Sequence, residues 1–438
     1  MKIALLKNIF LVAFLLFNTV SAIAYDCEVN GICYTRTSTS EVKVTYKSGY
    51  YSGDIVIPET IVFNGKTFTV TSIDDKAFMV CRQLTSVSLP KTIKTFGRMS
   101  FKGCVLLTSI TFPQDFESYS QDSFEECTSL SNIYVDENNQ KFRDIDGVLY
   151  SKDGTKLILC PMAKAQHTIV DGITSIEKNA FKGCAISSKI VIPSSVVSIG
   201  EGAFEACSNI EEIIIPNSVT TIEKKNFNGM NNLKSITLPD NLTRINSYLV
   251  SGCPLLTSIK IPENVTFIDG SAFSRNSGIT EITIPNNVET IWDGSFSDCT
   301  SLTTLRIGTG LKTVGCHSFD NCTKLYEIYC YPMTPPNYRL FTTKISSEPF
   351  EGVDKNWCTL YVPKGTISLY KHSSSKHRWG DFLYIEEFDA SAVSDCSVEN
   401  EKTKAVYYDI IGRKYTIDNY EKLPKGLYII SGKKIVRN

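Results

Sequence analysis

Histidine is scarce in this chain of 438 residues, which holds only His167, His317, His372 and His377. So few imidazoles argue against most catalytic centres and metal sites that use histidine as base or ligand. A basic excess is also missing, because 45 Lys and Arg stand against 46 Asp and Glu, a net charge of −1. Without positive charge to neutralise phosphates, we expect no nucleic-acid binding and no polybasic membrane patch.

Motifs of catalysis and cofactor binding are absent as well. The sequence has no G-x-S-x-G, no P-loop pattern and no C-x-x-C pair, which argues against a serine hydrolase, a nucleotide site and a zinc or thioredoxin-type redox site. His317 follows Cys316 in a predicted turn, so we interpret it as a surface imidazole. His372 and His377 lie in a serine-rich segment that we expect to be solvated. We therefore predict no enzyme, no cofactor and no metal.

Long apolar runs are absent beyond the N-terminus. Two lysines precede the nine apolar residues 9–17, and small residues stand at both ends of Ala22–Ala24. This pattern predicts a secretory signal peptide over residues 1–24, cut after Ala24. An uncleaved anchor is disfavoured, since a membrane span needs about 20 apolar residues. Lipidation at Cys27 is disfavoured because Tyr and Asp precede it. We expect an exported protein without a later membrane span, at the cell surface, in the outer membrane or outside the cell.

The chain is instead rich in an internal repeat. Phenylalanines recur every 23 residues, except for one step of 57, which contains an insertion of 34. Three residues after each phenylalanine position stands a cysteine in most copies. The first ladder is Phe78, Phe101, Phe124, Phe181, Phe204, Phe227, Val250, Phe273, Phe296 and Phe319. The second is Cys81, Cys104, Cys127, Cys184, Cys207, Met230, Cys253, Asn276, Cys299 and Cys322.

Each repeat predicts one turn of a solenoid. In the segment 233–239, Ile236 and Leu238 alternate with polar residues, as in a half-buried strand. Pro239 ends that strand because it has no N–H to donate. Leu242 and Ile245 begin the return segment, and the phenylalanine and cysteine positions fill the interior. One such repeat cannot bury its apolar face alone, so the pattern requires stacked neighbours.

The repeat resembles the leucine-rich repeat class, and more narrowly the BspA-like repeats of bacterial surface proteins. Segments 256–273 and 302–319 carry the resemblance, and segments 27–32 and 53–58 resemble the part that precedes the repeats in that family. The resemblance covers about residues 25–385. It implies a leucine-rich repeat solenoid with a parallel β-sheet on one face, mostly short strands and turns, and small β-rich terminal segments. It also implies adhesion to host matrix proteins or to other cells.

The insertion near 135–170 interrupts the repeat. Asp153-Gly154 between two apolar runs predicts a β-hairpin, which we expect to bulge out of the solenoid. A calcium loop at Asp144 and Asp146 is the alternative, but the later ligands of an EF-hand are missing.

The C-terminal part departs from the period. We interpret 331–388 as a cap with Trp357 and Trp379 in its core. The motif Y-D-x-x-G-R at 408–413, followed by L-x-x-G and G-K-K, resembles the C-terminal sorting domain of type IX secretion in Bacteroidetes. The predicted division is therefore 1–24 signal peptide, 25–66 N-terminal β segment, 67–330 solenoid, 331–388 cap and 389–438 sorting-like β tail.

The chain has 15 cysteines, an odd number. Eight stand in the ladder, and because Met230 and Asn276 share their position, we interpret them as buried thiols in a slot for a small or apolar group. Cys27 and Cys33 could form a disulfide across a hairpin turned at Asn30-Gly31.

The strands also predict an outward-facing surface. If they form one parallel sheet, two rows of side chains between the inward isoleucines point to solvent. The residues predicted to bind a ligand are Thr237, Lys260, Thr283, Arg306 and Tyr329 in one row, and Glu281 and Glu327 in the other. Solenoids commonly bind along such faces, although these residues could simply keep the sheet soluble.

Two functions remain open at this stage. The first is an adhesin for an extracellular protein or glycan of host or neighbouring cells. The second is a scaffold of the envelope without an external ligand. A glycan-degrading enzyme is a distant third, because it would need a convergent carboxylate pair.

Overall fold

The computed structural model describes residues 25–186, 188–338, 348–372 and 379–389, together with four strands between 405 and 437. The chain divides into two compact units, residues 1–390 and 391–438. The predicted signal peptide and Cys396 lie outside the described residues. Among the described residues, none of the helices has both the length and the apolar character to cross a membrane.

The first unit opens with antiparallel hairpins. Its strands are β1 (Cys27–Val29), β2 (Ile32–Arg36), β3 (Glu41–Val44), β4 (Ser52–Val56), β5 (Thr60–Phe63) and β6 (Lys66–Ile73). The predicted turn between β1 and β2 is confirmed, since Asn30 and Gly31 both have positive φ, as a type I′ hairpin requires. β3 and β4 then pair in parallel with β6 and β7 and begin the solenoid.

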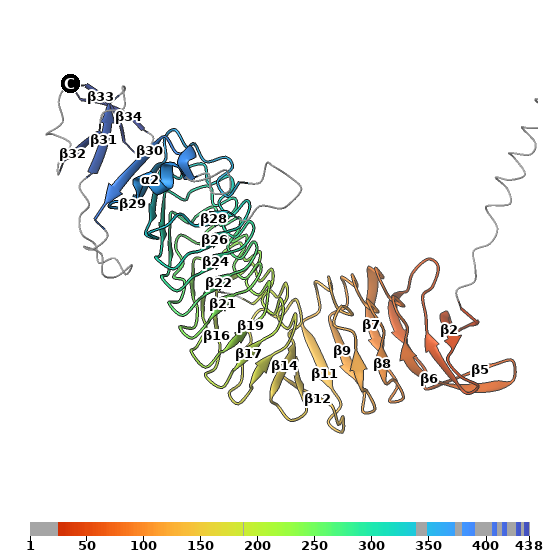
Figure 1. Cartoon of the computed structure of the whole chain (residues 1–438). Helices are drawn as coiled ribbons and strands as arrows, with labels where there is room; N and C mark the ends of the chain where they lie inside the picture. Colours follow the sequence, from red (N-terminus) through yellow and green to blue (C-terminus); the bar gives the residue numbers. More distant parts are fainter. Residues whose placement is uncertain are drawn as a thin grey trace, which may run out of the picture. The chain divides into compact units, whose positions relative to one another are not determined.

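The solenoid prediction is confirmed, and each regular turn places short strands on two faces (Figure 1). The first strand of each turn is the longer one, and these first strands pair in parallel sheets. Towards the N-terminus the sheets are β4-β7 (Gln83–Ser88) and β9 (Ser109–Phe112)-β11 (Asn132–Val135). The later sheets are β16 (Ser188–Val191)-β18 (Ile210–Ile214)-β20 (Ser235–Thr237) and β23 (Glu281–Ile284)-β25 (Thr304–Ile307)-β27 (Glu327–Cys330)-β29 (Thr359–Pro363)-β30 (Tyr384–Phe388). We call the outward side of these strands the first-strand face. Parallel sheets of this kind stack one repeat on the next, which buries the core that no single repeat could bury.

Second strands of two residues line the opposite face of the turns. They are β8 (Thr95–Phe96), β10 (Ser118–Tyr119), β15 (Ser175–Ile176), β17 (Ser198–Ile199), β19 (Thr221–Ile222), β21 (Arg244–Ile245), β22 (Phe267–Ile268), β24 (Thr290–Ile291), β26 (Thr313–Val314) and β28 (Asn337–Tyr338). We call their outward side the second-strand face. We predicted a sheet on one face only, because a second strand of two residues is too short to show alternation of polar and apolar side chains.

The phenylalanine ladder is a stack of buried rings. Phe78 lies 5.0 Å from Phe101 with an interplanar angle of 3°, and Phe296 lies 5.3 Å from Phe319 at 1°. Such offset stacking adds to the burial of the rings. Val250 replaces a ring and interrupts the stack, with the main chain unchanged, since its N–H still donates to Ala272 of the next turn.

The cysteine ladder consists of buried free thiols, as predicted. The slot is more specific than we expected from its occupants, because most of its thiols donate to the main-chain carbonyl of the phenylalanine position one turn earlier. Cys207 Sγ donates to Phe181 O at 2.9 Å and Cys253 Sγ to Phe227 O at 3.2 Å. The slot therefore holds a small hydrogen-bond donor in most turns, whereas Met230 fills it with a buried apolar side chain, as predicted.

Cys27 and Cys33 do not pair in this structure. In the β1–β2 hairpin Cys27 lies opposite Tyr34, and Cys33 lies opposite Glu28. Since neighbouring residues of a strand point to opposite faces, the two thiols are on different sides of the hairpin. Both are free and buried, so the suggested disulfide is not formed.

The insertion forms a hairpin, but it does not bulge out. β12 (Phe142–Ile145), β13 (Val148–Ser151) and β14 (Lys156–Leu159) form an antiparallel meander, and β14 pairs in parallel with β15. Leu149 packs in the core of the preceding turns, whereas Val148 and Tyr150 pack in the core of the following ones. The expectation was wrong because the apolar runs beside Asp153-Gly154 supply core side chains.

The predicted cap contains further solenoid turns. Phe350 stacks on Phe319 at 5.1 Å, so it continues the ring ladder after a longer step. α2 (Ile367–Lys371) and the 3-10 helix η1 (Trp379–Asp381) follow β29. Trp379 is buried as predicted and donates to Pro336 O at 2.9 Å. Trp357 was wrongly placed in the core, since it is 57% exposed at the turn that precedes β29.

The second unit is a four-stranded antiparallel sheet. Its strands are β31 (Ala405–Asp409), β32 (Lys414–Ile417), β33 (Gly426–Ile430) and β34 (Lys433–Arg437), in the order β32-β31-β33-β34. The short strands predicted in this segment are confirmed.

Candidate functional site

The predicted rows of outward residues are aligned across the sheet. Thr283 pairs with Arg306 and Arg306 with Tyr329, while Glu281 and Glu327 flank Thr304 in the other row. These residues come together because each turn contributes the same register position of its first strand. The predicted residues Glu281, Thr283, Arg306, Glu327 and Tyr329 therefore share one part of the first-strand face.

Lys260 and Thr237 lie apart from that group. Thr237 ends β20, and Lys260 stands in a turn without a strand, so the expected single sheet divides into two at this point. Ile259 and Ile261 stay buried and keep Lys260 outward. Pro254 stands in the same turn, directly after the cysteine slot at Cys253.

Arg306 and Tyr329 are held within a stack of side chains. The Arg306 guanidinium lies 5.0 Å from the centre of the Tyr329 ring and 2.8 Å from a carboxylate oxygen of Glu281. Tyr329 stacks on Tyr361 at 4.6 Å, and Phe388 meets Tyr329 edge-on. We call Arg306, Tyr329, Tyr361 and Phe388 the aromatic platform. Burial raises the pKa of Tyr329, so its hydroxyl stays protonated at neutral pH.

Sequence reasoning missed Tyr361 and Phe388. The strand 358–363 was recognised, and its alternation would have placed Tyr361 in line with Tyr329, because the two residues pair directly. The step from 329 to 361 is longer than 23 residues, and this hid the register.

The other part of the first-strand face is apolar. Val191 pairs with Ile214, and both stand out from the sheet, with 66% and 46% of their surfaces exposed. Lys189 and Glu212 flank them with an ion pair of 3.6 Å. Adjacent exposed apolar side chains of this kind favour contact with another molecule over contact with water.

A cavity lies beside the insertion. Cys160 takes the phenylalanine position there. Its N–H donates to Ala180 O, and one turn later the N–H of Phe181 donates in the same way to Ala203 O. No ring therefore fills this level, and a cavity of about 250 Å³ opens next to Phe124 and Met162. The cavity follows from the small side chain at this level of the ladder.

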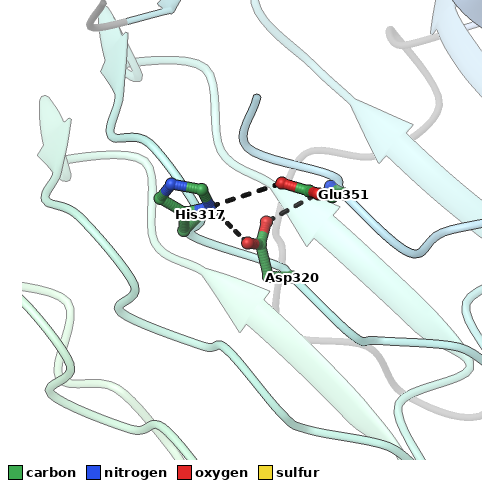
Figure 2. Close-up of side chains that lie close together, drawn as sticks. All are labelled: His317, Asp320 and Glu351. Atoms are coloured by element: carbon green, nitrogen blue, oxygen red, sulfur yellow. Dashed lines mark hydrogen bonds and ion pairs between the residues drawn. The ribbon is translucent and has the colours of Figure 1, made fainter. Parts of the chain in front are cut away.

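A second cluster joins His317, Asp320 and Glu351 (Figure 2). His317 Nδ1 contacts an Asp320 carboxylate oxygen and lies 3.7 Å from Glu351 Oε2. The expected surface imidazole is 45% exposed, but it faces two carboxylates. Burial raises the pKa of Asp320 despite the neighbouring imidazole. Asp144 and Asp146 do not form a comparable group: Asp144 accepts from Val135 N, and Asp146 pairs with Lys164.

Stacked turns with an L-x-x-I-x-I first strand define a leucine-rich repeat solenoid. The model of the BspA type leucine rich repeat region matches residues 59–146, 164–280 and 251–366, and the chain belongs to this family. No curated protein matches the chain.

Solved structures are similar in fold. A leucine-rich repeat protein from Eubacterium ventriosum is 20% identical and has a TM-score of 0.47; the match covers 74% of this chain and 92% of that one. One from Bacteroides ovatus is 20% identical over 70% and 95%, with a TM-score of 0.34. The pneumococcal vaccine antigen PcpA is 17% identical over 83% and 98%, with a TM-score of 0.38.

Proposed function

We propose that this chain is an exported cell-surface binding protein, an adhesin that recognises a protein or glycan of host or neighbouring cells through its first-strand face. The observation that carries the proposal is the composition of this face. It presents the exposed pair Val191 and Ile214 and, further along the turns, the half-buried Arg306 and Tyr329, which pack over the buried Tyr361 of the aromatic platform. Aromatic and arginine side chains are the usual anchors of binding surfaces.

The platform is suited to binding because its side chains are already ordered. Arg306 is fixed by Glu281 and by the Tyr329 ring, and Tyr329 by Tyr361. A ligand that contacts these groups loses little side-chain freedom on binding. Thr283 and Glu327 border them in the same rows, and Thr237 and Lys260 would extend the contact along the face.

The export route belongs to the proposal as well. Residues 1–24 would direct the chain out of the cytoplasm, and the sorting-like tail 389–438 would address it to the outer membrane. We assign the regular repeats to 67–330, between an N-terminal β segment at 25–66, whose last strands begin the solenoid, and a C-terminal cap at 331–388, which adds its final turns. Its partner would be an extracellular protein or glycan.

The test uses the purified chain from residue 25, screened against matrix proteins, mucins and glycans. The variant Lys260→Ala, Arg306→Ala, Tyr329→Ala is measured in parallel. A matched control is Arg244→Ala with Phe267→Ala, because Arg244 also lies over an aromatic ring, at 4.2 Å, and pairs with a carboxylate, but on the second-strand face.

Saturable binding that is lost in the triple variant and kept in the control supports the proposal. Binding that survives in the triple variant contradicts the assignment of the platform. A chain that binds none of these ligands and is not exposed on intact cells favours the envelope scaffold instead.

A further inference from the structure

One surface position of the solenoid carries a ladder of polar and charged side chains, and its last two members are both carboxylates. This position directly follows each phenylalanine position, and equivalent side chains of successive turns contact one another. Along the chain it is occupied by Met79, Lys102, Glu125, Pro161, Lys182, Glu205, Asn228, Ser251, Ser274, Ser297, Asp320 and Glu351.

The middle of this ladder is electrically balanced. Glu125 lies 2.9 Å from Lys102 and 3.3 Å from Lys182, and Lys182 lies 3.6 Å from Glu205. Asn228 then donates to Glu205 at 3.1 Å. Charges of opposite sign thus alternate from turn to turn, and serines follow. Like charges on adjacent strands would be destabilising.

Asp320 and Glu351 do not follow this alternation of charge. Two carboxylates occupy successive levels with no cationic level between them, and the main chain fixes them there. Phe319 N donates to Pro349 O at 2.7 Å, Asn321 N to Glu351 O at 2.8 Å, and Glu351 N to the Asp320 carboxylate at 3.2 Å. These bonds hold the two residues side by side on successive turns, while the Glu351 side chain stays exposed to solvent.

The lysine at 355 forms its ion pair with another residue. Lys355 contacts the carboxylate of Glu348, although its charge also acts on Glu351 and Asp381. The group that faces both carboxylates is His317, whose backbone is fixed in the left-handed region, with φ of 57°. Its N–H donates to Glu348 O at 3.0 Å, which turns the imidazole toward Asp320 and Glu351.

We propose that His317, Asp320 and Glu351 bind a zinc-type divalent cation. One nitrogen and two carboxylate oxygens, all within 4.8 Å of one another, converge there. A tetrahedral zinc ion with ligand bonds near 2.1 Å needs ligand atoms about 3.4 Å apart, and His317 Nδ1 and Glu351 Oε2 are already 3.7 Å apart. An imidazole ligand favours zinc over calcium, which prefers six or more oxygens.

The ion would join two successive turns. Asp320 and His317 belong to the turn of Phe319, whereas Glu351 belongs to that of Phe350, after the irregular step in the repeat. A cation that binds the folded state alone stabilises it, and the stabilisation grows with the logarithm of the cation concentration above Kd. The site would thus fasten the C-terminal turns of the solenoid, contrary to the expectation of no metal drawn from the sequence. The inference does not rest on the proposed binding function.

The experiment titrates zinc into the metal-free full chain by calorimetry and repeats the titration with Co²⁺ in an absorption spectrometer. We expect one equivalent of Zn²⁺ to bind, and affinity to fall more than about tenfold in Asp320→Asn, in His317→Gln and in Glu351→Gln. Glu351 is 63% exposed, so its variant folds even if the others do not. The control is Asp146→Asn, which alters the other histidine–aspartate contact and leaves zinc binding unchanged.

The cobalt spectrum distinguishes this site from the thiols. Ligation by nitrogen and oxygen gives d–d bands without the intense thiolate-to-cobalt band, and this spectrum is the expected one. The proposal is overturned if the folded chain binds no zinc saturably, if Glu351→Gln binds as tightly as the native chain, or if the bound cobalt shows thiolate ligation.

Discussion

Asn276 Nδ2 donates to the main-chain carbonyl of Val250, one turn earlier in the solenoid, at 2.7 Å. The same amide nitrogen donates to Phe273 O at 2.9 Å, and Asn276 Oδ1 accepts from Cys253 N at 2.9 Å. Asn276 occupies the cysteine slot, in which Cys299 Sγ donates to Phe273 O at 3.4 Å. Thiol and amide therefore meet the same requirement, a donor for a buried carbonyl.

Asn276→Leu should destabilise the solenoid. Leucine fits the apolar surroundings but leaves the Cys253 N–H and the Val250 carbonyl without partners, at a cost of about 1–3 kcal/mol for each unsatisfied group. Asn276→Cys restores the common donor and should lose less. Urea unfolding followed by circular dichroism measures both. If the leucine variant unfolds at the same urea concentration as the native chain, the slot does not select for a donor.

Val80→Gly should stabilise the chain or leave it unchanged. Val80 has φ of 59°, a conformation in which a β-branched side chain is strained by about 1–3 kcal/mol. Glycine relieves that strain, at some cost in the entropy of the unfolded chain. The control is Val62→Gly, at an exposed strand position with ordinary φ, which should lower the melting temperature. A lower melting temperature in Val80→Gly contradicts the prediction.

His167 should make the insertion less stable in acid. Burial lowers the pKa of His167 below its ordinary value of 6.5, against the opposing charge of Asp146 and with the help of Lys164. Its Nε2 lies 2.6 Å from the Tyr150 hydroxyl. The unfolded chain therefore binds a proton more readily than the folded one, and stability falls as pH drops through about 6.5.

The variant His167→Gln tests this titration. The fall in melting temperature between pH 8 and pH 5 should be smaller in the variant than in the native chain, because the buried group that must gain a proton is gone. Equal pH dependence in the two proteins would show that His167 does not titrate differently in the folded and unfolded states.

The described cysteines should not react with maleimide in the folded protein. All fourteen are buried, and burial raises the pKa of thiols such as Cys253 and Cys299 to about 12, so little thiolate is available. In the variant Cys396→Ser, mass spectrometry should find no label until urea unfolds the chain. Rapid labelling of a ladder cysteine without denaturant would contradict the buried ladder.

The regular part of the fold could be predicted because its signal is periodic. Phe296 and Cys299 recur at fixed distances in many turns, and only a buried, stacked position explains this. Deviations from the period carry no such support. Phe350 continues the ring stack after a step of 31 residues, and the apolar runs around Asp153-Gly154 are compatible with either an external or an internal hairpin.

The candidate site was harder to predict from the sequence than the fold. The outward positions of Arg306 and Tyr329 follow from alternation along the strand, but their stacking depends on distances between turns. Glu351 could not be matched to Asp320, because the step between their turns is 31 residues instead of 23. Trp357 shows the converse limit, since its aromatic character suggested burial although the structure exposes it.

The measurement closest to the central claim compares the two faces in one binding assay. In the Cys396→Ser chain, Thr237→Cys on the first-strand face and Thr221→Cys on the second-strand face each provide one exposed thiol for a maleimide-linked polymer. The account predicts that polymer at 237 abolishes binding to the ligand found in the screen, while polymer at 221 leaves it unchanged. Blockage from 221, with binding intact after labelling at 237, would contradict the account.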